Sequence, residues 1–199
     1  RVDAHSPAQP LVDQAVFRPL AARIYLGQAH KKQLNSQRWG GWRRMLILRP
    51  RLRTNGFYML HHSYIKKLQR DMFTQVPVGQ ILEVNYWRYL RFFNNGTCLY
   101  SMLYQEPQEV TSLLKAGPGG KVCMGKFSVA KNMVKVEVAA PHAIIGFELE
   151  IQPPMFNGHF SQLLLTDHWS MSYNDIGGKV SHKCNGLPRF HFFKVAYDF

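Results

Sequence analysis

The sequence predicts a mostly β protein, an antiparallel meander β-barrel of seven to eight strands preceded by two or three α-helices. Apolar residues recur at helical spacing up to Leu48, and after Arg53 they form strand-like runs that Gly, Asn and Pro interrupt. These runs follow one another at hairpin spacing. A closed barrel is favoured over an open sheet because closure removes exposed strand edges.

The helical domain is predicted at residues 1–50 and the barrel domain at residues 51–199. A first helix is expected within 11–34, where apolar residues recur three and four positions apart. A second helix should begin at Asn35-Ser36 and end before Pro50, because a proline disfavours the helical state of the residue that precedes it. The predicted buried face of this second helix carries Trp39, Trp42 and Leu46.

The strands are predicted at 56–69 (as one or two strands), 83–93, 97–104, 121–129, 132–140, 143–152, 159–171 and 188–197. Asn94-Asn95-Gly96 predicts a hairpin turn, because Asn and Gly tolerate positive φ. A short helix is expected from Glu106-Pro107 to Leu114, before a glycine-rich cluster.

Composition restricts the class of protein. A chain of 199 residues with 46% apolar content can bury a full core, and no apolar run reaches the length of a membrane helix. The three cysteines, Cys98, Cys123 and Cys184, are widely separated without CxxC spacing, which favours reduced thiols. We therefore expect a cytoplasmic protein in a reducing compartment, with the nucleus as the alternative.

The net charge of +13 is uneven along the chain. Residues 1–82 hold fourteen Lys and Arg against three Asp, a balance of +11, and residues 83–199 carry only +2. Such asymmetry indicates an acidic protein, a nucleic acid or an anionic membrane surface as partner.

Five arginines lie at the transition from helix to strand and are the candidate partner-binding residues: Arg43, Arg44, Arg49, Arg51 and Arg53. The alternative is a solvated basic face whose arginines cover apolar surface and hold the helix against the barrel. Nucleic acid is disfavoured, because Trp39 and Trp42 fit core positions better than exposed stacking positions.

Strand 84–93 places Arg88 and Arg91 on opposite faces, so one arginine should point into the barrel. An unpaired charge there is costly, so the sequence predicts a carboxylate partner for it. The alternative is that this arginine binds an anionic group.

Several of these residues resemble motifs of the F-box only protein 9 family, in the region that follows the F-box. The matching segments, in order, are Trp42-Arg43, Arg49-Pro50-Arg51, Gly56 with Tyr58, Trp87-Arg88-Tyr89-Leu90-Arg91-Phe92-Phe93, Asn95-Gly96 and Glu106-Pro107-Gln108. The resemblance extends over roughly residues 36–199, more weakly after residue 123. The motif residues expected to be structural are Trp42, Pro50, Gly56, Tyr58, Arg88, Tyr89, Arg91, Phe92, Phe93 and Gly96.

The resemblance implies a substrate-recognition adaptor of an F-box-type cullin–RING ubiquitin ligase. Residues 15–28 look like the last helix of an F-box, whereas the leading half, which would contact the Skp-type linker and through it the cullin, is not in this sequence. Binding of these partners is thus implied by relatives alone. The substrate is left open.

The residues themselves indicate a non-catalytic, protein-binding chain. No nucleophile elbow, phosphate-binding loop or metal-ligand spacing is present, so we expect no catalytic residue, no metal and no cofactor. Two alternatives to the adaptor remain: a structural subunit of a larger assembly that docks through its basic helices, and a lipocalin-like carrier of a small ligand. The carrier requires an interior cavity of roughly 300 Å³ or more.

Overall fold

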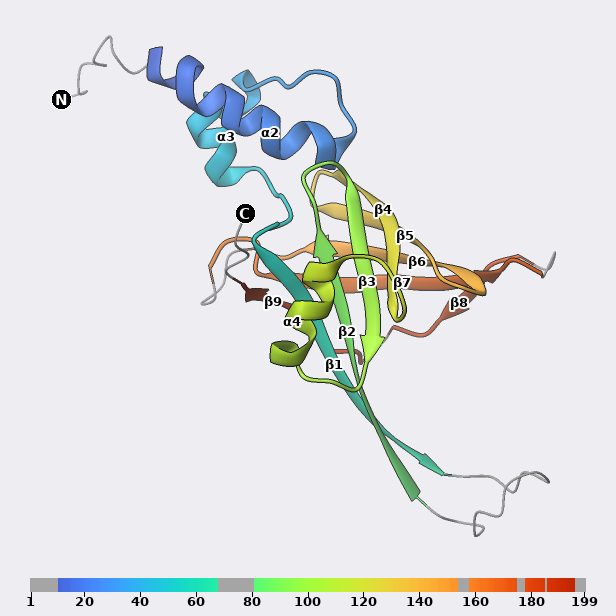
Figure 1. Ribbon diagram of the computed structural model, residues 1–199. Helices are drawn as coiled ribbons and strands as arrows, with labels where there is room; N and C mark the ends of the chain where they lie inside the picture. Colours follow the sequence, from blue (N-terminus) through green and yellow to red (C-terminus); the bar gives the residue numbers. More distant parts are fainter. Residues whose placement is uncertain (1–10, 68–80, 154–157, 175–177, 185, 196–199) are drawn as a thin grey trace.

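The computed structural model describes residues 11–67, 81–153, 158–174, 178–184 and 186–195, and it shows a helical segment seated on one end of a closed β-barrel (Figure 1). This confirms the predicted fold class. Within the described residues, no helix has the length and apolar character that crossing a membrane requires.

The helical elements differ in one respect from the prediction. They are the π-helix η1 (Asp13–Phe17), α2 (Arg18–Ala29), the 3₁₀-helix η2 (Gln37–Trp39), α3 (Trp42–Leu48) and α4 (Pro107–Ala116). The single helix expected from Asn35 to Arg49 was wrong, because it is two short helices separated by Gly40 and Gly41 at φ of 74° and 116°. Positive φ ends a right-handed helix, and glycine adopts it at little cost.

Nine strands form the sheet: β1 (Gly56–Lys67), β2 (Ile81–Phe92), β3 (Thr97–Leu103), β4 (Val122–Ala130), β5 (Met133–Ala139), β6 (Ala143–Ile151), β7 (Gln162–Ser172), β8 (Val180–His182) and β9 (Phe190–Lys194). Strands β1 to β7 are consecutive antiparallel neighbours, and β9 pairs with both β7 and β1 to close a barrel of eight strands. The sequence missed β8, which pairs with the outer edge of β7. The predicted strand ends at 68–69 and 196–197 lie outside the described residues.

Alternation along the strands fills the barrel with side chains. On β5, for example, Val134, Val136 and Val138 are buried, while Lys135 and Glu137 are exposed. The largest side chains of this interior cluster are Tyr58, Phe92, Tyr100, Phe127, Phe147 and Phe190. A second cluster lies on the outer face of β1 to β4, where α4 packs over Phe57, Tyr89 and Leu99. An interior filled in this way disfavours the carrier hypothesis.

Strands β1 and β2 extend beyond the barrel as a two-stranded ribbon (Figure 1). Strand β9 pairs with β1 only as far as Met59, and β3 pairs with β2 only from Trp87 onward. Beyond these residues, the described part of the chain shows β1 and β2 paired only with each other, as far as Lys67 and Ile81. Most of their side chains are consequently exposed on this stretch, and His62, Val84 and Tyr86 are half-buried.

The C-terminal half of α2 fixes the helical segment to the barrel. The buried side-chain amide of Gln28 donates to the carbonyl of Leu52 and accepts from its N–H, both at 3.0 Å, and we call this pair the Gln28 clamp. Gly27 lies so close to the turn between β2 and β3 that a Cβ would be 1.8 Å from the Asn94 carbonyl oxygen. His30 Nε2 lies 2.7 Å from the Phe127 carbonyl oxygen. Three contacts thus hold α2 at one angle to the barrel.

We predict that Gln28→Leu lowers the free energy of unfolding by about 3 kcal/mol, because it leaves a buried N–H and a buried carbonyl of Leu52 without partners. Urea denaturation followed by tryptophan fluorescence measures this change. Gln33→Leu, at an exposed position, is the control and should differ from wild type by less than about 0.5 kcal/mol. Equal stability of the two variants would contradict the role assigned to the clamp.

Candidate functional site

The candidate site is the junction between the helical segment and the barrel, where the chain from Arg49 to Asn55 runs without helix or strand. Leu52 is buried here, whereas Arg51 and Arg53 on either side of it are partly exposed. This alternation is that of an extended backbone, whose successive side chains point to opposite sides. The junction therefore directs arginines outward while Leu52 is held by the Gln28 clamp.

Three of the five candidate arginines make specific contacts at the junction. The Arg49 guanidinium lies 4.5 Å from the ring centre of Tyr25, and the Tyr25 hydroxyl donates to the Arg49 carbonyl at 3.1 Å. Arg51 Nη1 donates to the Leu46 carbonyl at 2.6 Å. The Arg53 guanidinium lies 3.9 Å from the ring centre of Phe192 on β9. These contacts stabilise the junction and fix where its positive charges lie.

Arg43 and Arg44 lie elsewhere, exposed on the first turn of α3. That turn is held by Asp13, whose carboxylate accepts hydrogen bonds from the N–H groups of Trp42 and Arg43 at 3.0 and 2.9 Å. A carboxylate at a helix N-terminus satisfies N–H groups that have no partner within the helix. The five arginines therefore do not form one cluster.

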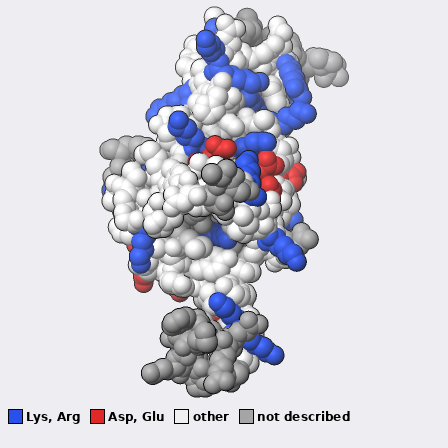
Figure 2. Space-filling model, turned by 90° about the vertical axis from the view of Figure 1, so that its right-hand side faces the viewer, with Lys and Arg blue, Asp and Glu red and all other residues white. Residues whose placement is uncertain are grey.

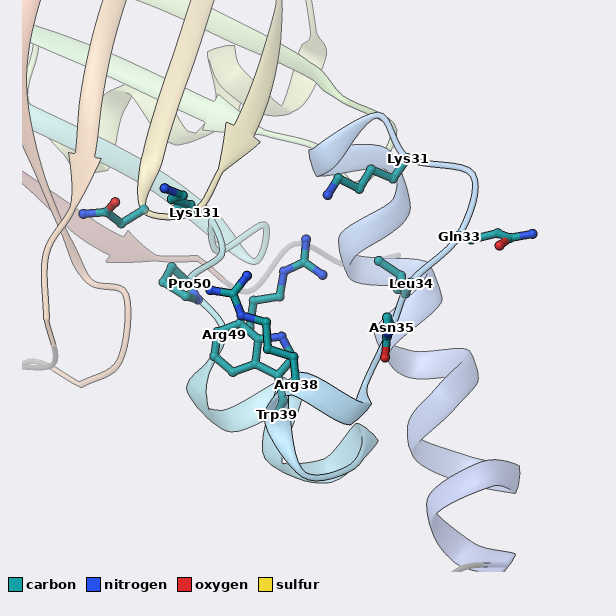
Figure 3. A pocket seen from close by; sticks show the side chains of 10 residues that line it. Lys31, Gln33, Leu34, Asn35, Arg38, Trp39, Arg49, Pro50 and Lys131 are labelled. Atoms are coloured by element: carbon teal, nitrogen blue, oxygen red, sulfur yellow. The ribbon is translucent and has the colours of Figure 1, made fainter.

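A basic pocket of about 490 Å³ lies beside the junction (Figure 3). Its cations come from separate segments: Lys31 from the loop after α2, Arg38 from η2, Arg49 from the end of α3 and Lys131 from the turn between β4 and β5. The remaining lining residues are Gln33, Leu34, Asn35, Trp39, Pro50 and Asn132. Among the residues that the structure describes, the lining contains four basic residues and no acidic one.

No described lining residue carries a negative charge that would compensate the four cations of this pocket. Partial burial lowers the pKa of the Arg49 guanidinium, and the neighbouring Arg38 lowers it further. Figure 2 shows that Lys and Arg side chains gather over the helical end of the molecule on the face in view. An anionic group bound among these cations would relieve their mutual repulsion and form charge-assisted hydrogen bonds.

Two further hollows continue from the basic pocket. A mostly apolar hollow of about 300 Å³ shares Pro50 and Asn132 with it and is lined also by Ile47, Leu48, Ile151 and the acidic Glu150, whose Oε1 accepts a hydrogen bond from Asn132. The other hollow, of about 480 Å³, shares His159 and Phe160 with the apolar one and contains Arg51 and Arg53. We call this series the junction groove. It alternates basic, apolar and basic stretches around the contact between helices and barrel.

Lys131 occupies an unusual backbone position in the junction groove. Its φ of 58° lies in the left-handed region, which costs a non-glycine residue about 1 kcal/mol. It is an exposed residue of a two-residue hairpin turn, where glycine would fit better. The turn thus carries a cation at the expense of local stability.

The motif residues noted in the sequence occupy structural positions. Tyr58, Tyr89 and Phe92 are fully buried, and the Tyr89 hydroxyl donates to the Gln105 carbonyl at 2.6 Å. Trp42 packs against α2, and Phe93 packs beside α4. A Cβ at Gly56 would lie 2.1 Å from the Phe193 carbonyl oxygen, and Gly96 has a φ of 85°. These residues build the scaffold of the junction groove.

The sequence did not identify Lys31, Arg38 and Lys131 as site residues, because they are far apart along the chain. Trp39, expected in the core, is only half-buried and lines the basic pocket. The sequence feature that could have indicated this site is the lysine at position 131, which occupies a tight hairpin turn where glycine is more usual.

Comparison with known proteins identifies one family. The family model of the F-box only protein C-terminal region matches residues 31–147, which include all ten lining residues of the basic pocket and strands β1 to β5. No solved structure matches the chain.

We predict that Lys131→Gly raises the free energy of unfolding by roughly 1 kcal/mol, because glycine removes the cost of positive φ at this turn. Lys126→Gly, at an exposed position within β4, is the matched control and should lower it by a similar amount. Thermal and urea unfolding measure both. A loss of stability in Lys131→Gly would show that the left-handed turn carries no strain.

Proposed function

The chain belongs to the F-box only protein C-terminal region family, and we propose that it acts as the substrate-recognition adaptor of an F-box-type cullin–RING ubiquitin ligase in the reducing interior of the cell. Membership of this family implies protein partners. In the proposed role the chain holds a substrate near the ubiquitin-carrying enzyme. The chain thereby raises the effective concentration of the substrate at that enzyme, and it makes or breaks no covalent bond itself.

The observation that supports this role is the junction groove. A protein segment with an acidic or phosphorylated side chain followed by apolar ones matches the basic pocket and the apolar hollow that adjoin at Pro50 and Asn132. Arginine suits carboxylate and phosphate groups because its guanidinium binds two oxygens at once. The groove also lies on a junction that three contacts hold fixed, so a bound segment is oriented relative to the barrel.

The state of the cysteines supports a non-catalytic role. Burial raises the pKa of the Cys98 thiol to about 12, and it also raises the pKa values of Cys123 and Cys184. A thiol acts as a nucleophile in its thiolate form, so these three are poor candidates for ubiquitin transfer.

We predict that the double variant Arg38→Glu with Lys131→Glu loses substrate proteins while it retains the Skp-type linker and the cullin. Each substitution replaces an attraction for an anionic segment by a repulsion, at two exposed side chains of the basic pocket. The protein is tagged at its own gene, and the proteins that co-purify with wild type and variant are compared by quantitative mass spectrometry.

The matched control is Arg43→Glu with Arg44→Glu, which makes the same change of charge at exposed positions that do not line the junction groove. It should retain the substrates. If both double variants lose the same proteins, overall charge rather than the pocket governs binding. If wild type recovers neither linker nor cullin and instead co-purifies in fixed stoichiometry with one large complex, the adaptor proposal fails and the structural-subunit alternative replaces it.

A further inference from the structure

Arg88 on β2 is the arginine that points into the barrel, in the half opposite the helices. It neighbours Leu60 of β1 and Met102 of β3, and its side chain lies on the same face of β2 as the interior residues Leu90 and Phe92. Only 8% of Arg88 is exposed. Arg91 faces the other way and donates from Nη1 to the Leu114 carbonyl of α4 at 2.6 Å.

The contacts of Arg88 within the described residues are with neutral groups. Its Nη1 lies 3.4 Å from His168 Nδ1, a long contact in which the neutral histidine accepts. Its guanidinium carbon lies 5.6 Å from the ring centre of Tyr86 and 6.0 Å from that of Phe147. Its buried Nε has no hydrogen-bond partner in this part of the chain.

The expected internal ion pair was wrong for the described residues, where no carboxylate contacts Arg88. Asp167, next to His168 on β7, directs its Oδ1 to the backbone N–H of His168 at 2.9 Å. A buried guanidinium without a counter-charge costs several kcal/mol, and an unsatisfied N–H adds to that cost. The fold therefore retains a charge that it does not neutralise from these residues.

The histidines near Arg88 add no fixed charge. Burial, Arg88 and His182 lower the pKa of His168 to about 3, and burial together with Arg88 lowers the pKa of His62. His182 is exposed, contacts the His168 ring at 4.6 Å between centroids and pairs with Ser170 across 2.8 Å. The group around Arg88 is thus one positive charge among aromatic rings, next to an exposed polar pair.

We propose that Arg88 binds the carboxylate of an organic monoanion whose apolar part packs on the half-buried ring of Tyr86. One fixed positive charge matches one negative charge, and two parallel N–H groups of a guanidinium match the two oxygens of a carboxylate. A phosphate dianion would be left with an uncompensated negative charge in an aromatic surrounding. This site is independent of the junction groove, which lies at the helical end of the barrel.

Benzoate is the probe, with neutral benzamide as its matched control. Benzoate should raise the unfolding temperature of the whole chain and shift the His168 ring signals in NMR spectra, whereas benzamide should do neither. N-acetylphenylalanine, which presents a carboxylate at the end of a peptide-like group, tests whether the natural carboxylate belongs to a chain end. Tighter binding of N-acetylphenylalanine than of benzoate assigns a chain end, and the reverse order assigns a free acid.

Arg88→Met removes the charge and keeps much of the side-chain volume. We expect it to weaken benzoate binding by about tenfold or more and to unfold, without ligand, at the wild-type temperature or above. Arg91→Met on the same strand should unfold at a lower temperature yet bind benzoate as wild type does, because Arg91 contacts α4. Arg88→Lys, which keeps the charge, should bind benzoate more weakly than wild type and more tightly than Arg88→Met.

Three results would overturn the proposal. The first is a lower unfolding temperature of ligand-free Arg88→Met, as expected if a carboxylate of this chain already paired with Arg88. The second is the absence of any effect of millimolar benzoate on wild type. The third is stronger binding of inorganic phosphate than of benzoate, which would assign a different anion to this site.

Discussion

The two hydrogen bonds of the Gln28 clamp are the interaction on which the remaining architecture depends. They satisfy both backbone groups of Leu52 from a side chain of α2, at a point where the chain has neither helix nor strand to supply partners. Because Leu52 is thereby fixed, the arginines on either side of it face outward, and the end of α3 lines the basic pocket together with the turn between β4 and β5. Without these two hydrogen bonds, the distance between the helical residues and the barrel residues that line the basic pocket would not be fixed.

Much of the barrel could be predicted from the sequence, because alternation of apolar and polar residues specifies both the strand and its buried face. The break in the second helix could not be predicted in this way. Apolar spacing indicates which positions are buried, but it does not indicate that Gly40 and Gly41 adopt positive φ. Strand β8 was missed because its three residues are all exposed and carry no alternation. The choice between Arg88 and Arg91 as the inward arginine depended on which face of β2 the helix α4 covers.

The candidate site was only partly accessible to sequence reasoning for a related reason. A run of five arginines suggests one surface, but the helix and the extended segment that carry them point them in different directions. The basic pocket instead combines Arg49 with Lys31, Arg38 and Lys131, which the closure of the barrel and the docking of α2 bring together. Arg88 is notable because it is buried, and the lack of a carboxylate beside it among the described residues can be recognised only when its neighbours in space are known.

The closure of the barrel has a consequence for biosynthesis. Strand β1 meets its neighbour β9 across most of the length of the chain, and among the described residues β9 joins β7 through two residue pairs, Gln162 with His191 and Leu163 with Phe190. While a ribosome is still translating, β1 and the start of β7 at Gln162 and Leu163 therefore expose unpaired backbone edges until Phe190–Lys194 have emerged. During that interval the nascent chain is a target for chaperones, and premature termination shortly before β9 would yield an aggregation-prone open sheet.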